Sequence, residues 1–177
     1  MNWLFAAVIC TASVVCAGTF ADEFTDADTN KDGVISKDEF AAYQSAALQL
    51  PPALVQSLSD AAAALAKDDL AGYQKHLPAV LAAVKETTGA VRATLLPLSE
   101  RLTAGKDLKS ARKPFEPFSN AAANFVAAQP PEKRQAKVFQ CPMSPVLTVG
   151  RWIQKDNPKL QNPFFGSQML TCGSEVK

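Results

Sequence analysis

Residues 28–39 read DTNKDGVISKDE, an acidic stretch with a glycine at its centre. Its first, third and fifth residues all carry side-chain oxygens, so these oxygens recur at alternate positions. Gly33 follows at the sixth position, where a chain can turn sharply because glycine adopts positive φ without strain. Glu39 closes the stretch at the twelfth position. This spacing predicts a tight loop whose oxygens converge on one point, with a helix on either side.

The pattern of residues 28–39 resembles the EF-hand loop, since Ca²⁺ prefers hard oxygen ligands at this spacing. The seventh residue supplies a backbone carbonyl, and the ninth binds directly or through a water. The predicted calcium ligands are Asp28, Asn30, Asp32, Val34, Ser36 and Glu39. We therefore predict a single EF-hand over residues 22–50, with Ca²⁺ as its cofactor. Extracellular modules bind calcium weakly, which favours a constitutively filled structural site over a switch.

Charge is unevenly distributed along the chain. Residues 22–39 hold seven acids and two bases, a balance of −5, whereas the remaining ten acids and sixteen bases give +6. An acidic head fits a cation site, and the basic excess elsewhere is interpreted as a solvated helix surface. The net charge of +1 indicates neither nucleic acid nor a membrane surface as a partner.

The N-terminal segment is typical of a targeting sequence. Residues 3–15 form an unbroken apolar and small-residue run, which is short for a bilayer span but has the length of a signal-peptide core. We predict that residues 1–21 are a signal peptide, cleaved after Ala17 or Ala21. The protein is then exported to the periplasm or the extracellular space. The alternative is an N-terminal segment that stays uncleaved and anchors the protein.

A helical body is expected after Pro51-Pro52, because two prolines interrupt a helix. We take residues 53–177 as this body. Its first part shows apolar residues at helical spacing. The predicted helices cover residues 53–66, 70–86, 90–103 and 107–127. The predicted fold class is mainly α, an EF-hand helix-loop-helix followed by an antiparallel four-helix bundle with short connections.

The tail of the chain differs from the helical part. From Lys137 onward the helical period is lost, and residues 137–140 and 149–154 are predicted to be short strands. Asn162-Pro163 and Gly166 indicate turns. An irregular tail that packs back onto the bundle is therefore expected.

Four sulfur-bearing residues bracket this tail. Two cysteines remain once the signal peptide has left, and a methionine lies near each of them. Soft sulfur ligands suit Cu(I), so the tail is a candidate copper site. In an oxidising compartment the same two cysteines can instead form one disulfide, with the methionines filling the core. Both interpretations stay open, and the residues concerned are Cys141, Met143, Met169 and Cys172.

The tail also resembles a known family. After CPM at residues 141–143 it reads GRWIQKDNPKLQNPFFGSQMLTCGSEV over residues 150–176. A helical segment, CPM, a Trp and NP(Y/F)(Y/F)G..MLTCG characterise a bacterial family of envelope domains without a settled function. Its members occur alone or attached to periplasmic adaptors of heavy-metal efflux systems. The resemblance covers about residues 55–177. It implies handling of copper or another heavy metal by the four sulfur residues, with such an efflux system as partner.

An enzyme is not expected. His76 is the sole histidine, and no paired base, activated nucleophile or phosphate-binding glycine loop accompanies it. Neither a small-molecule substrate nor a nucleic acid is indicated. The predicted function is that of an exported calcium-binding accessory protein for copper or other heavy metals. The alternative is a structural or interaction scaffold, in which calcium and a Cys141–Cys172 disulfide only stabilise the fold.

Overall fold

The computed structural model describes residue 25, residues 27–156 and residues 159–177. The predicted signal peptide, with its cleavage sites and cysteines, lies outside the described residues. The chain divides into two compact units, residues 1–46 and 47–177. Each unit is described by itself. None of the described helices combines the length and the apolar character that crossing a membrane requires.

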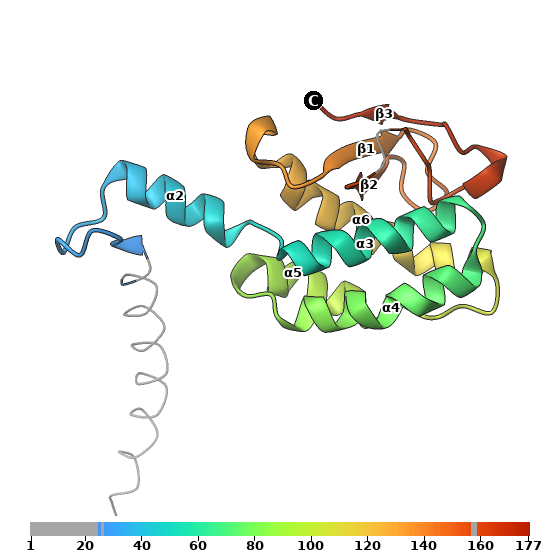
Figure 1. Cartoon of the computed structure of the whole chain (residues 1–177), viewed down its shortest axis with the longest axis horizontal. Coiled ribbons are helices and arrows are strands. Elements are labelled where there is room, and N and C mark those ends of the chain that lie inside the picture. The colour runs from blue at the N-terminus through green and yellow to red at the C-terminus, as the bar shows by residue number, and fades with distance from the viewer. Residues whose placement is uncertain (1–24, 26, 157–158) are drawn as a thin grey trace, which may run out of the picture. The chain divides into compact units, whose positions relative to one another are not determined.

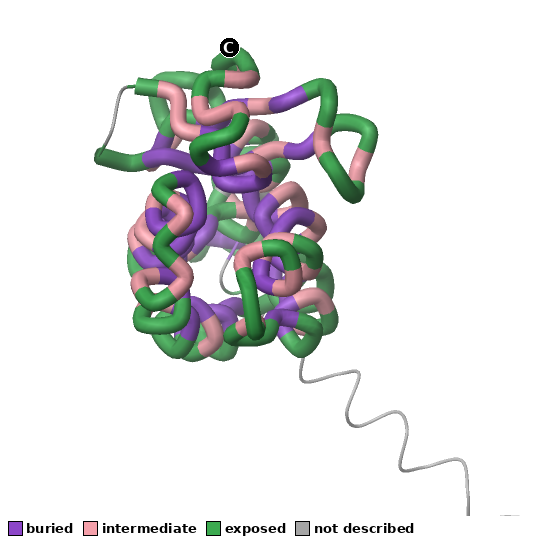
Figure 2. Tube along the Cα trace, turned by 90° about the vertical axis from the view of Figure 1, so that its right-hand side faces the viewer, coloured by how far each residue is buried: buried purple, intermediate pink, exposed green. Residues whose placement is uncertain are grey.

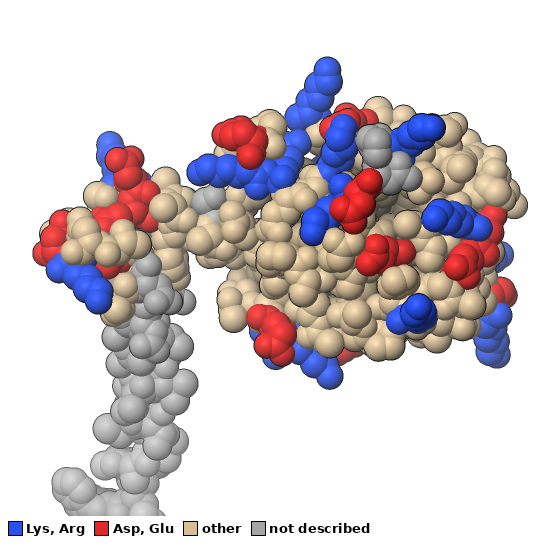
Figure 3. Space-filling model, viewed as in Figure 1, with Lys and Arg blue, Asp and Glu red and all other residues tan. Residues whose placement is uncertain are grey.

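The first unit contains the acidic stretch and most of helix α2, Lys37–Ala47, which starts directly after the predicted loop. Asp38 and Glu39 lie in the first turn of α2, where negative charge interacts favourably with the helix dipole. Acidic side chains dominate the charged surface of this unit, whereas charges of both signs are scattered over the visible face of the second (Figure 3). The loop and the start of the exiting helix are thus found where the sequence predicts them.

Four further helices form the first part of the second unit, and with α2 the described residues contain five. They are α3 (Pro52–Ala66), α4 (Leu70–Lys85), α5 (Gly89–Ser99) and α6 (Leu108–Ala127). Local chemistry explains where they begin. Pro52 stands in the first turn of α3, where its missing N–H costs nothing. The Asp69 side chain caps α4 through Gly72 N, and Asp107 forms a reciprocal capping box with Ser110 at α6.

A small antiparallel sheet follows the helices. Strand β1 (Lys137–Cys141) lies in the centre, with β2 (Gly150–Gln154) on one side and β3 (Ser174–Glu175) on the other. In the β1–β2 register Phe139 faces Trp152 and Cys141 faces Gly150. The short 3-10 helices η1 (Pro131–Lys133) and η2 (Gly166–Gln168) complete the described elements. Both predicted strands are present, and β3 is an addition to the prediction.

The second unit is mainly helical, but an antiparallel four-helix bundle is not confirmed. Strand β2 packs across α6 and α3, while α4 and α5 lie on the side of these helices away from the sheet (Figure 1). Helices cover the sheet because one face of the sheet is apolar. Val138 and Ile153 pair on one face and are almost fully buried, which requires a cover. Trp152, the neighbour of Ile153 in β2, points to the opposite face, where it packs against Phe139 and Phe164. Figure 2 shows buried residues concentrated where sheet and helices meet.

The core of the second unit starts earlier in the chain than Pro51-Pro52. Leu50 is only 2% exposed and belongs to the same hydrophobic cluster as the helices and the sheet. The Gln135 side chain donates a hydrogen bond of 2.9 Å to the Leu50 carbonyl. The two prolines therefore lie inside the second unit.

Candidate functional site

The acidic loop is folded by hydrogen bonds from its backbone to its own side chains. Asp28 accepts from Asp32 N at 3.2 Å and from Gly33 N at 2.9 Å. Asp32 accepts in turn from Val34 N at 2.8 Å. Gly33 has φ +84°, and Lys31 also lies in the left-handed region at φ +58°. The glycine thus occupies the position where the turn requires it.

Glu39 closes the loop from the first turn of α2, through contacts that we call the Glu39 clasp. Its Oε1 accepts from Asn30 N and from Thr29 Oγ1, both at 3.1 Å. Its Oε2 accepts from Ser36 N at 3.0 Å and from Ser36 Oγ at 2.8 Å. These donors, the Ser36 backbone first, lower the pKa of Glu39 from 4.5 to about 2. Glu39 is therefore a carboxylate at any physiological pH.

The loop fits calcium in the chemistry of its donors. All six predicted ligands offer oxygen, and they lie within one short loop. Within the described part of the chain, however, no three Asp, Glu, His or Cys side chains form a group that could hold a metal ion. The carboxylates of Asp28 and Glu39 instead accept hydrogen bonds from amides of the loop. A cation would have to bring Asp28, Asp32 and Glu39 closer together.

The cysteine pair is the second candidate site. Cys141 ends β1 and is fully buried, and Cys172 lies half-buried two residues before β3. Because β1 and β3 pair, the two free thiols face each other with their Sγ atoms 3.2 Å apart. The hydrogen bond with Cys141, followed by burial, raises the pKa of Cys172. The structure thus brings together two of the four predicted sulfur ligands.

The two methionines differ in their exposure to solvent. Met143 is 56% exposed in the loop after β1, and Met169 is half-buried directly after η2. The backbone N–H of Cys172 donates to the Met169 carbonyl at 3.0 Å, which places Met169 in the same turn as one thiol. Met143 follows the other thiol in sequence but lies open to solvent.

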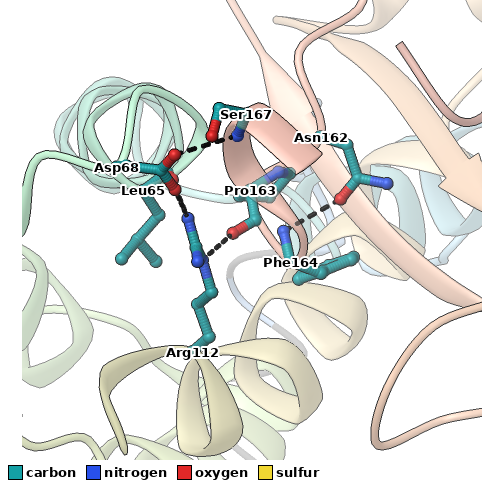
Figure 4. Close-up of polar contacts among 7 residues, drawn as sticks. All are labelled: Leu65, Asp68, Arg112, Asn162, Pro163, Phe164 and Ser167. Carbon is teal, nitrogen blue, oxygen red and sulfur yellow. Dashed lines mark hydrogen bonds and ion pairs between the residues drawn. The ribbon is translucent and has the colours of Figure 1, made fainter. Parts of the chain in front are cut away.

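Arg112 on α6 is a key residue that sequence reasoning missed. Its Nε donates to the Pro163 carbonyl at 2.8 Å, and its Nη2 donates to the Leu65 carbonyl and to Asp68. The second Asp68 oxygen accepts from Ser167 N at 3.1 Å. Figure 4 shows the guanidinium between the end of α3 and the segment around η2. The hydrogen bonds from Ser167, and after them Arg112, lower the pKa of Asp68.

Glu116, one turn further along α6, was missed as well. It is 1% exposed and accepts hydrogen bonds from the loop between β1 and β2. The donors are the Ser144 hydroxyl, Val146 N at 3.1 Å and Leu147 N at 2.6 Å. We call these contacts the Glu116 clasp. The sequence gives one hint of it, an acid directly beside Phe115 on the apolar face of the helix.

No protein-family model, no curated protein and no solved structure matches this chain. The resemblance of the tail to an envelope family therefore stays a prediction, and so do the predicted efflux partner, the export and the absence of enzymatic activity. The acidic loop and the cysteine pair are the two candidate functional sites.

Proposed function

We propose that this protein binds Ca²⁺ through residues 28–39. One observation carries the proposal: six oxygen donors at EF-hand spacing lie in a loop whose turn is made by Gly33 at positive φ. When bound, the ion supplies a positive charge at the centre of the loop. Asp28, Asp32 and Glu39 supply the negative charge that holds it there.

The role proposed for this ion is structural, in an exported accessory protein. Sensor EF-hands open a groove between helices when calcium binds. The single loop of this chain fits a structural role better than such a sensor role. Here the Glu39 clasp already ties the start of α2 back to the loop through Asn30 and Ser36. Bound calcium would hold the loop and the start of α2 together by electrostatic attraction to the carboxylates.

Isothermal titration of the full chain with CaCl₂ tests the proposal. We expect one calcium per chain, with a Kd between about 10⁻⁶ and 10⁻³ M. Asp28→Ala and Glu39→Gln should each weaken binding at least tenfold, because each removes a charged ligand. Asp38→Asn is the matched control, since Asp38 lies beside Glu39 in the first turn of α2 but is not a predicted ligand. Equal affinity in all four proteins would contradict the assignment.

Soft-metal handling at the cysteine pair is the second candidate function. It is favoured by one observation, the two free thiols 3.2 Å apart with Cys141 buried. Thiolates are ligands for Cu(I), and the half-buried Met169 is the nearest thioether in sequence to Cys172. In this proposal the protein is an accessory to a heavy-metal efflux system of the bacterial envelope.

Thiol counting and competition for Cu(I) against a chelator of known affinity test this second candidate. In the protein without the predicted signal peptide, which carries Cys10 and Cys16, two free thiols and one copper per chain are expected. Binding should be lost in Cys141→Ser and retained in Met143→Leu, because Met143 is exposed. A fully oxidised pair that binds no copper would favour the scaffold alternative, with a Cys141–Cys172 disulfide instead of a metal.

A further inference from the structure

A cavity of about 810 Å³ lies in the second unit, beside the first turns of α6. Its other walls come from Asp68, from the loop at Pro145 and Val146, and from the segment around η2. Cavities of this volume accommodate small organic ligands. Neither the calcium loop nor the cysteine pair belongs to it.

Hydrogen bonds fix the walls of this cavity. Arg112 joins α6 to the end of α3 and to the carbonyl of Pro163 (Figure 4). The Glu116 clasp joins the same helix to the loop at Val146. A cavity with walls held in this way is formed before any ligand arrives, which lowers the entropic cost of binding.

The acids that line the cavity are already occupied by partners from the protein. Asp68 pairs with Arg112 and accepts from Ser167, and Asp107 caps α6 through Ser110. Glu116 accepts from the loop between β1 and β2. Hydrogen bonds thus hold all three carboxylates in place, and Asp68 has Arg112 as its cationic partner in addition.

Two lysines in the same lining are exposed and carry no ion pair. Lys109 and Lys113 are one turn apart on α6, so they lie on one face of the helix. The ion pairs Arg112–Asp68 and Lys137–Glu175 include neither of these lysines, and Lys109 interacts electrostatically with Asp107. Aliphatic and aromatic side chains supply much of the remaining lining, namely Leu108, Pro145, Val146, Phe164 and Phe165.

We propose that this cavity binds one small amphiphilic molecule with an apolar body and a carboxylate end, of which a medium-chain fatty acid is the simplest example. The apolar body fills the space against Phe164 and Val146, and the carboxylate pairs with Lys109 and Lys113. Charge complementarity favours an anionic end, because the exposed charged residues of the lining are two lysines and one acid, and that acid, Asp107, caps α6. The inference goes beyond calcium binding and does not depend on it.

Titration of the full chain with sodium dodecanoate, below its micelle concentration, tests this inference. We expect one dodecanoate per chain. Lys109→Gln/Lys113→Gln should weaken binding about fivefold or more, since one partly exposed ion pair contributes up to about a factor of five. Lys75→Gln/Lys85→Gln removes the same charge from exposed positions on α4 and should bind like the parent protein. Dodecanol, which lacks the charge, should not distinguish the two double variants.

A second variant tests the place of binding. Val146 is 45% exposed in the cavity lining, so Val146→Trp should fill the entrance without removing the backbone N–H that Glu116 accepts. Weaker binding of both dodecanoate and dodecanol is expected. Unchanged binding of both in a folded Val146→Trp protein would overturn the site.

The ligand class would be overturned by any of three results. These are equal dodecanoate affinity in both lysine double variants, equal binding of dodecyltrimethylammonium, or binding only to phosphatidylglycerol vesicles.

Discussion

Glu39 and Glu116 are the centres of two similar clasps in different units of the molecule. Each carboxylate accepts from two backbone N–H groups and from a serine hydroxyl, Ser36 in one case and Ser144 in the other. The donors of Glu39 lie within ten residues, on a loop that is largely exposed. The donors of Glu116 lie 28 to 31 residues away, and the carboxylate itself is 1% exposed.

This difference separates a binding role from a folding role. Glu39 is 9% exposed, but most of the loop around it is exposed, so water can replace the donors and the carboxylate can exchange amides for a cation. Glu116 is more deeply buried, at 1% exposure, so a donor lost from its clasp leaves the carboxylate buried with fewer partners, although the loop that supplies the donors is partly exposed. The same chemistry therefore supports an ion site in one unit and fixes a loop in the other.

Removal of each carboxylate should show the difference between the two clasps most clearly, as a difference in stability. Glu116→Ala is expected to lower the free energy of unfolding by about 3 kcal/mol, because it leaves two N–H groups and the Ser144 hydroxyl without their buried acceptor. Glu39→Ala in calcium-free protein should leave the urea midpoint of the second unit unchanged. Urea denaturation of both variants measures this, and equal midpoints would show that the Glu116 clasp does not support the fold.

Acid titration tests whether the Glu39 clasp lowers the pKa of its carboxylate. The pKa of Glu39 is about 2 in the folded loop and 4.5 when its partners are gone. Its contribution to stability is thus fully present above pH 4.5 and is lost as the pH falls through 2. Ser36→Ala should raise the pKa towards 4.5, and Thr29→Ala should raise it less, because the Thr29 bond is the smallest contribution. Carboxyl ¹³C NMR of calcium-free protein reports the values, and a parent pKa near 4.5 would refute the clasp.

A third buried polar group has no partner and should give the smallest effect. Tyr73 on α4 is fully buried with its ring edge-on to Phe115, and burial raises its pKa to about 12. Its hydroxyl is the one buried side-chain polar atom in the described residues without a hydrogen bond. Tyr73→Phe is expected to raise the free energy of unfolding by up to about 1 kcal/mol. A marked loss of stability on thermal denaturation would instead reveal a partner for the hydroxyl.

Local patterns predicted the local structure well. Apolar spacing located α3 and α4 to within one or two residues. The loop from Asp28 to Glu39 was readable because all its partners lie close in sequence. The two predicted strands were readable because the helical period stops at Lys137.

Long-range partners were not predictable from the same patterns. The backbone N–H groups of Val146 and Leu147 are present at every residue except proline, so nothing in the sequence marks them as partners of Glu116. Arg112 likewise bonds to carbonyls at Leu65 and Pro163, which any residue would offer. Strand β3 has two residues and therefore no alternation to detect. The role of the sheet as a cover for α3 and α6 follows from packing that only the fold reveals.

The strand order β2–β1–β3 has a consequence for how the chain folds during synthesis. Central strand β1 needs residues 174–176 for its second edge, where Val176 N donates to the Val138 carbonyl at 2.8 Å. The hairpin of α3 and α4 can form while translation continues, because its contacts are local. The sheet edge, and with it the meeting of Cys141 and Cys172, has to wait until residue 176 has left the ribosome. The two thiols therefore stay apart through most of the protein's synthesis.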